Sequence, residues 1–174
     1  MKTVTSWAYS ASKALITIFG IVMTVVIIAQ VFCRTFLGFS IYWAEELARY
    51  LLVWITFLGA SMAFRNADLA SFDLVQKKLK PEWQWIYRLF IEASVLFFVA
   101  VAFYYGIKQT FSPSIMNQVS PALRLPMSVN YMAVPAGFGL MLIYGLSSII
   151  TLFLNQRKKE EVESYQVGVA KEAK

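Results

Sequence analysis

Charged side chains are rare in this sequence, and those that fall within long apolar runs are the best candidates for a chemical role. Glu45, Glu46 and Arg49 stand at the start of one apolar run, and Glu92 lies well inside another. An ionisable group inside a membrane is costly, so acids at such positions are candidates for proton or ion sites. The same acids also form structural ion pairs or contact partner proteins, which leaves three roles open for each of them.

Ion pairing is the simplest role for the first group. On a helix, Glu45 and Arg49 lie four residues apart on one face, with the acid N-terminal to the base, which is the favourable order. Arg34 leaves the preceding apolar run at the same depth and is expected to pair with Glu46. The adjacent Trp43 belongs to a residue type that favours the headgroup level. The alternatives for this group are contact with a partner subunit and a proton or ion site.

Glu92 has a similar structural explanation. Arg88 lies one turn away on the same helix face, and Arg65 ends the neighbouring apolar run on the same side of the membrane. A structural ion pair with these cations is therefore expected. A transport role and a contact with a partner protein are the alternatives.

Other kinds of chemistry are excluded by what the sequence lacks. It has no histidine and one cysteine, Cys33, so histidine catalysis, a zinc–thiolate cluster and an intrachain disulfide are ruled out. It has no phosphate-binding loop and no nucleophile paired with a base, so we predict neither an enzyme nor a bound metal or cofactor. The net charge of +6 does not indicate nucleic-acid binding, because the basic residues flank apolar runs instead of lining one polar face.

Apolar runs long enough to cross a bilayer determine the fold class. The 174 residues are 59% hydrophobic and 15% charged, which lies outside the range of soluble globular chains. We therefore predict an all-α integral membrane protein. Its membrane domain, residues 1–156, should have four spans at about 14–34, 43–64, 83–107 and 127–155. A short interfacial helix over residues 3–12 is expected before the spans, and a disordered polar cytoplasmic tail, residues 157–174, after them.

The distribution of basic residues predicts the orientation. Four spans place both termini on one side of the membrane. Twelve of the sixteen Lys and Arg residues fall on that side, and the four on the opposite side are Arg34, Arg49, Lys108 and Arg124. Because cytoplasmic loops carry the excess of Lys and Arg, both termini are predicted to be cytoplasmic.

The second apolar run carries a face suited to contact with another helix. At about 100° per residue, the face of Glu45 and Arg49 continues through a stripe of mostly small residues. These residues are Leu52, Thr56, Gly59, Ala60 and Ala63. Small side chains let helix backbones approach closely, and exposing the charged end to lipid would be costly, so this face should meet protein. In the fourth run, Pro135 and Gly137 predict a kink or close packing.

Several of these residues resemble a known family. The motifs are Trp43-Ala44-Glu45-Glu46, Arg49, Trp54, Leu58-Gly59-Ala60, Arg65 and Asp73, followed by Leu123, Pro126, Tyr131, Pro135 and Gly137. In these residues, in its length and in its four spans, the chain resembles the DctQ-type small membrane subunit of tripartite ATP-independent periplasmic (TRAP) transporters. It departs from the family in one place. Members often carry a histidine between Arg65 and Asp73, and this chain has Leu69 near that position.

The resemblance implies a division of labour in a bacterial inner membrane. A large membrane subunit would carry the substrate and sodium sites and move as an elevator, and this chain would scaffold it without a site of its own. A soluble periplasmic binding protein would deliver the substrate, an organic acid of the C4-dicarboxylate or sialic acid class, with the sialic acid branch favoured. Membrane lipids would cover the remaining surface.

Two other classes of function compete with the scaffold. A self-contained homo-oligomeric channel or small exporter would need polar residues along one helix, and the apolar runs offer only scattered Thr, Ser and Gln. A membrane enzyme would need a catalytic constellation, which the sequence lacks. The sequence therefore favours a non-catalytic subunit of a secondary transporter, and isolation of a larger membrane partner would separate it from the channel.

Overall fold

Long helices make up most of the chain. The computed structural model describes residues 2–67 and 81–172. In chain order its elements are α1 (Lys2–Phe32), a π-helical turn η1 (Cys33–Leu37), α2 (Tyr42–Ala67), α4 (Pro81–Thr110), α5 (Pro113–Met116), α6 (Ser128–Tyr131) and α7 (Ala133–Glu172). Within these two segments the β-structure is limited to one isolated bridge, between Val119 and Pro126. The predicted all-α fold is confirmed.

Among the described residues, four helical stretches are long and apolar enough to cross a membrane, as predicted. They cover Thr5–Leu37, Tyr42–Asn66, Leu89–Thr110 and Ser128–Leu154. No more than 17% of the most apolar part of each stretch is buried within the chain. Exposed apolar surface of this extent is not tolerated in water, so lipid or another protein must cover it.

The N-terminal residues do not form a separate interfacial helix. Residues 3–12 are helical, as expected, but they continue without a break into the first span as part of α1. Neither glycine nor proline occurs before Gly20 to interrupt the helix. Thr5 and Ser12 are buried at 9% and 3% exposure, so one side of these first turns packs against the rest of the chain.

The C-terminal residues are also helical. Basic residues 157–159 were expected to end the fourth helix and to begin a disordered tail, but α7 continues to Glu172. Cations mark the limit of a membrane span without breaking the helix itself, and residues 157–167 contain neither glycine nor proline. The expectation of disorder is therefore corrected for residues 157–172.

Residues 68–80, between α2 and α4, lie outside the described part of the chain. This segment contains two positions of the family resemblance, Leu69 and Asp73. It also contains Leu74, Val75 and Leu79, whose spacing indicates a short amphipathic turn. These expectations stay untested.

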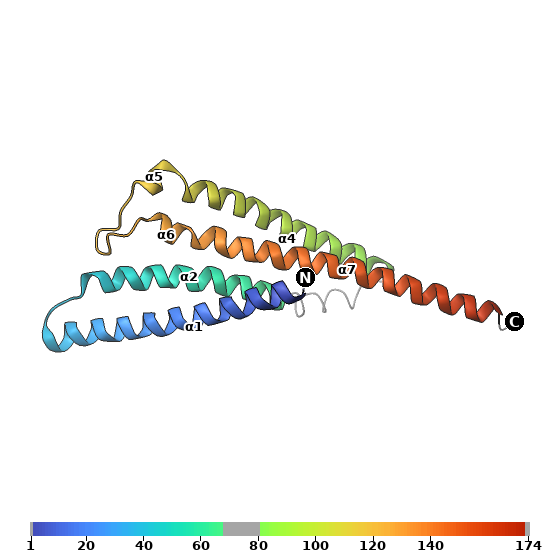
Figure 1. Cartoon of the computed structure of the whole chain (residues 1–174), viewed down its shortest axis with the longest axis horizontal. Coiled ribbons are helices and arrows are strands. Elements are labelled where there is room, and N and C mark those ends of the chain that lie inside the picture. Colours follow the sequence, from blue (N-terminus) through green and yellow to red (C-terminus); the bar gives the residue numbers. More distant parts are fainter. Residues whose placement is uncertain (1, 68–80, 173–174) are drawn as a thin grey trace.

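The four long helices lie side by side in the order α1, α2, α7, α4 (Figure 1). Helix α1 packs against α2, and α7 lies between α2 and α4. Both termini lie at the same end of this row, which we call the terminal end. The connections from α1 to α2 and from α4 to α7 lie at the opposite end, called the loop end.

Aromatic side chains and glycines make the contacts between neighbouring helices. Phe19 of α1 meets Trp54 of α2 edge to face, with ring centroids 6.4 Å apart. Between α2 and α7, a Cβ atom on Gly137 would lie 2.8 Å from the carbonyl oxygen of Phe57, so only glycine permits this approach. Between α4 and α7, a Cβ atom on Gly139 would lie 3.2 Å from the ring of Phe103.

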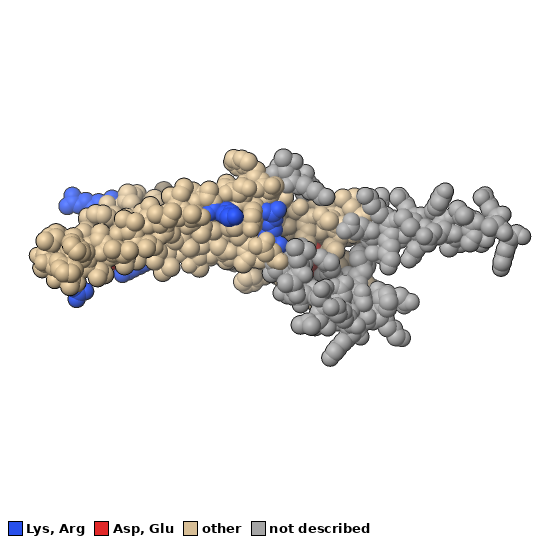
Figure 2. All heavy atoms as spheres, turned by 90° about the horizontal axis from the view of Figure 1, so that it is seen from below, with Lys and Arg blue, Asp and Glu red and all other residues tan. Residues whose placement is uncertain are grey.

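The outer surface of the described helices is largely uncharged. In the view of Figure 2, Lys and Arg side chains occupy only a few places on an otherwise uncharged surface. The exposed apolar side chains include Ile21 at 60%, Phe97 at 72% and Phe98 at 66%. A bilayer accounts for this surface, because lipid tails solvate apolar side chains without cost.

Candidate partner interface

The carboxylate of Glu46 joins the first turns of α2 to a distant loop. Its Oε2 atom accepts hydrogen bonds from the backbone N–H groups of Ala122, at 2.9 Å, and Leu123, at 3.0 Å. The hydroxyl of Ser120, which is 1% exposed, lies beside the same carboxylate. The described partners of this carboxylate are thus loop groups, and not the predicted Arg34. Backbone donors have no sequence signature, so side-chain patterns could not identify them.

The loop that Glu46 binds, residues 117–127, has a hairpin-like backbone, and we call it the tip loop. Met127 N–H donates to the Gln118 carbonyl at 3.0 Å, and Ser120 N–H donates to the Leu125 carbonyl at 2.9 Å. Arg124 closes the turn with a φ of 53°, in the left-handed region that is uncommon for any residue other than glycine. Its side chain is exposed.

The carboxylate of Glu45 also has a partner other than the one predicted. Gln30 of α1 donates from Nε2 to Glu45 Oε1 at 3.0 Å. Gln30 is 9% exposed, and a buried amide requires a partner, so this bond fixes α1 against α2 near the loop end. The expected ion pair between Glu45 and Arg49 is therefore replaced by a bond between helices.

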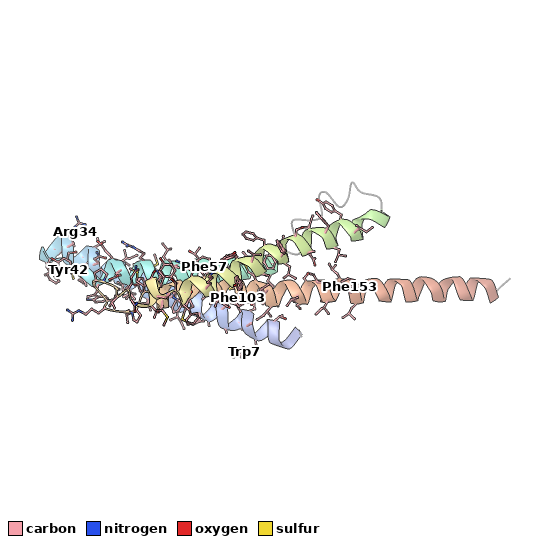
Figure 3. All side chains as sticks on the ribbon, turned by 90° about the horizontal axis from the view of Figure 1, so that it is seen from above. Trp7, Arg34, Tyr42, Phe57, Phe103 and Phe153 are labelled. Carbon is pink, nitrogen blue, oxygen red and sulfur yellow. The ribbon has the colours of Figure 1, made fainter. Side chains whose placement is uncertain are left out.

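Arg34 and Arg49 are exposed cations at the loop end, and neither forms an ion pair with another described residue. Arg49 is near enough to Glu46 to interact with it electrostatically. Figure 3 places Arg34 and Tyr42 together at the loop end, with Phe57 and Phe103 near the middle of the row. Trp43, at the start of α2, is 46% exposed.

The stripe of small residues on α2 points away from the rest of the chain. Arg49, Leu52, Thr56, Ala60 and Ala63 are all exposed. A Cβ atom on Gly59 would have no neighbour within 4 Å. The Thr56 hydroxyl donates to the Leu52 carbonyl at 2.8 Å, so no free donor remains on it. This face is therefore open, smooth and able to accept another helix closely.

Glu92 faces the last helix. Ser148 of α7 donates a hydrogen bond to Glu92 Oε1 at 3.3 Å. The Arg88 side chain lies outside the described residues, so that predicted pair stays untested. Arg65, the second cation expected beside Glu92, instead lies over the ring of Tyr9 at 4.4 Å and near the ring of Tyr144 at 5.6 Å. These cation–π contacts join α2 to α1 and α7, because arginine stacks on aromatic faces.

Pro135 lies in the first turn of α7 and leaves one carbonyl without its usual donor. A helical residue at 135 would donate to the carbonyl of Tyr131, and proline cannot. The hydroxyl of Thr110, at the end of α4, shares its single proton between the Gly106 carbonyl, at 2.8 Å, and the Tyr131 carbonyl, at 3.3 Å. The chain breaks at this point into α6 and α7, and Gly137 follows within the close contact to Phe57.

Within residues 2–67 and 81–172, no group of three or more His, Cys, Asp or Glu side chains is placed to hold a metal ion. What the described residues provide is an open helix face on α2 beside a braced, cationic loop end.

The comparison with known families decides where this architecture belongs. The family described as "Tripartite ATP-independent periplasmic transporters, DctQ component" matches residues 23–155. The chain belongs to the DctQ family. The match begins within the first span and includes the other three spans and the whole tip loop, so Glu45, Glu46 and the open face of α2 lie within the family's own domain.

Curated relatives carry names from the same transporter class. A putative TRAP transporter small permease protein of Haemophilus influenzae is 30% identical over 75% of this chain and 81% of its own length. The C4-dicarboxylate TRAP transporter small permease protein DctQ of Rhodobacter capsulatus is 31% identical over 62% of this chain. The isethionate TRAP transporter permease protein DctMQ of Oleidesulfovibrio alaskensis is 29% identical over 58% of this chain. The match spans only 47% and 16% of the lengths of these last two relatives.

Proposed function

We propose that this TRAP small permease subunit is a non-catalytic scaffold for a larger, elevator-type membrane subunit. The observation that supports this most is the open face of α2. An arginine and a stripe of small residues face outward from the helix row, and lipid tails would leave the charge poorly solvated. A partner helix laid along Gly59 and Ala63 would cover the stripe and would bring polar groups to Arg49.

Hydrogen bonding inside the spans supports a scaffold over a channel. The hydroxyls of Thr17, Thr24, Thr56, Ser94 and Thr151 each donate to the carbonyl four residues earlier, at 2.8–2.9 Å. A hydroxyl bonded to its own helix has no proton left to donate to a passing solute. These described hydroxyls keep only acceptor lone pairs, and they are scattered over four helices instead of lining one path through the chain.

The transported substrate and the coupling ion belong to the partner in this proposal. We propose sodium-coupled uptake of an organic acid, of the C4-dicarboxylate or sialic acid class, with both sites on the large subunit and delivery by a periplasmic binding protein. The relative named DctMQ supports the association, because the match covers only 16% of a longer permease protein. Two of the relatives are named for different substrates, isethionate and C4-dicarboxylate, so homology leaves the substrate class open.

Co-purification followed by reconstitution tests the proposal. A tagged chain, solubilised in mild detergent, should carry a larger membrane protein with it. Liposomes that contain both proteins should take up the organic acid when the loaded binding protein and a sodium gradient are supplied. Liposomes that contain this chain alone should take up none. Uptake by the chain alone, or full uptake by the large protein without this chain, would contradict the scaffold.

A further inference from the structure

We propose that the tip loop is a preformed docking element for a water-soluble protein that presents carboxylates. In this role, Arg124 is the contact cation and Glu46 is the residue that holds the loop in shape. The inference rests on the proposed function and on the orientation that places the loop end outside the cytoplasm. It goes further by assigning a direct contact with a soluble partner to this small subunit.

The loop end has an unbalanced charge that favours an acidic partner. The connections and helix ends there carry four cations, Arg34, Arg49, Lys108 and Arg124, and two acids, Glu45 and Glu46. All four cations are exposed. Glu45 is exposed and accepts one bond from Gln30, and Glu46 accepts bonds from loop N–H groups. With four cations against two acids, the net charge of this end is positive.

The tip loop is held more firmly than a connection between two helices requires. Two backbone bonds close its stem, and Glu46 binds two N–H groups at its turn. An ionised acceptor makes such bonds stronger than neutral ones. Arg124 keeps a left-handed backbone that costs a residue with a side chain about 1–2 kcal/mol, and such strain persists only where the surroundings impose it.

The fixed geometry favours a protein over lipid headgroups as the occupant. Lipid phosphates diffuse and can reach a flexible arginine, so a lipid contact needs no preformed backbone. A protein surface gains from preorganisation, because less conformational freedom is lost on binding. The loop also exposes Val119 at 59% and Leu125 at 42% on either side of its turn. An arginine flanked by apolar side chains, in a loop that contains no acidic residue, is a composition typical of protein interfaces.

The test uses the complete transporter in liposomes of zwitterionic phosphatidylcholine, with the loaded binding protein as the probe. Arg124→Gly removes the cation and relieves the left-handed strain, so the loop stays folded. The concentration of binding protein that gives half-maximal uptake should rise about five- to tenfold, because a charge at an interface acts mainly on association. Arg124→Lys should stay within about twofold of the parent. Added choline chloride at constant sodium should reduce the difference between Arg124→Gly and the parent.

Two further variants separate positioning from general charge. Glu46→Gln keeps the shape of the side chain but loses the charge that binds Ala122 and Leu123. It should raise the half-saturating concentration without changing the maximal rate at saturating binding protein. Lys108→Ala removes a cation from the same end outside the tip loop and should have an effect below about twofold.

Specific results would overturn the docking role. One is an unchanged half-saturating concentration for Arg124→Gly in a complex that assembles normally. Another is an equal rise in the half-saturating concentration for Lys108→Ala, which would mean that the positive charge of this end acts without a defined site. An effect of Arg124→Gly seen only with anionic lipids would assign the loop to headgroups. Failure of the parent chain to assemble with a larger membrane protein would instead contradict the proposed scaffold function.

Discussion

Single side chains at the loop end divide into those that brace the chain and those that remain available. Glu45 and Glu46 brace it, through Gln30 and through the tip loop. Arg49 stands one turn further along α2 and is exposed. Arg65 near the opposite end of α2 contacts two tyrosine rings within the chain. The two arginines of one helix therefore have opposite roles, one directed outward and one inward.

This division predicts opposite effects of removing each arginine. Arg49→Ala should leave the unfolding free energy of the isolated chain within about 0.5 kcal/mol, because its side chain is exposed and its only described interaction is a solvent-screened one with Glu46. The same change should destabilise the complex with the large subunit by about 2 kcal/mol or more, since it strands an acceptor in the interface. Arg49→Lys should recover only part of this loss, because lysine lacks the planar fork. Thermal unfolding of the chain and of the complex in mild detergent measures both effects.

Arg65→Ala is the matched control for that experiment. It should lower the unfolding free energy of the isolated chain by about 1 kcal/mol through the loss of the contacts to Tyr9 and Tyr144. If Arg49→Ala behaves like the parent both alone and in the complex, Arg49 is a solvated interfacial charge and not a partner contact.

Between elements, the α6–α7 break is explained by one proline and one hydroxyl. Pro135 withholds a donor from the Tyr131 carbonyl, and the Thr110 hydroxyl of α4 partly replaces it at 3.3 Å while sharing its one proton with the nearer Gly106 carbonyl. Thr110 is 1% exposed, so water cannot easily replace it. The contact between the Thr110 hydroxyl and the Tyr131 carbonyl thus joins the start of the fourth span to the end of the third, next to the tip loop.

A double-mutant cycle tests this tie. Thr110→Val should cost about 0.5–1 kcal/mol, the usual range for a hydrogen bond between membrane helices. In a Pro135→Ala background the new N–H can satisfy the Tyr131 carbonyl, so Thr110→Val should then cost much less. Reversible unfolding in mixed micelles provides the four free energies. Equal costs of Thr110→Val in the two backgrounds would show that the hydroxyl does not serve this carbonyl.

At the scale of the whole molecule, a row of four helices leaves broad surfaces uncovered. Leu58 is 4% exposed and belongs to the core, whereas the adjacent Gly59 lies on the open face. These two neighbouring residues of α2 therefore belong to two different surfaces. One surface holds the chain together, and the other is available for assembly.

Substitutions at these two positions should separate folding from assembly. Gly59→Leu should leave the isolated chain almost unchanged and reduce co-purification of the large subunit severalfold, because a bulky side chain keeps the helices apart. Leu58→Ala should destabilise the isolated chain by about 2 kcal/mol or more through the cavity it leaves, and at a temperature where it is folded it should impair assembly less than Gly59→Leu. Recovery of equal amounts of complex would count against the α2 face as the interface.

The orientation of the row is a further prediction at this scale. In a Cys33→Ser background, Asn117→Cys places a thiol at the loop end and Ser164→Cys places one beyond the last span. If both termini are cytoplasmic, a membrane-impermeant maleimide should label the first variant in intact cells and the second only after permeabilisation. The reverse pattern would show that the excess of basic residues does not set the topology of this chain.

The sequence by itself determined the number of spans, the all-α class and the small-residue face of α2. These follow from local hydropathy and helical periodicity, which each segment carries on its own. Only the tertiary structure decided that this face meets no other described part of the chain. Only the tertiary structure decided the partners of Glu45, Glu46 and Arg65 as well. In a chain this poor in charge, opposite charges close in sequence suggested ion pairs, but the helix packing brought an amide, two backbone N–H groups and two tyrosine rings nearer. Backbone donors are identical at every position, so no residue pattern could have indicated a bond from position 46 to positions 122 and 123.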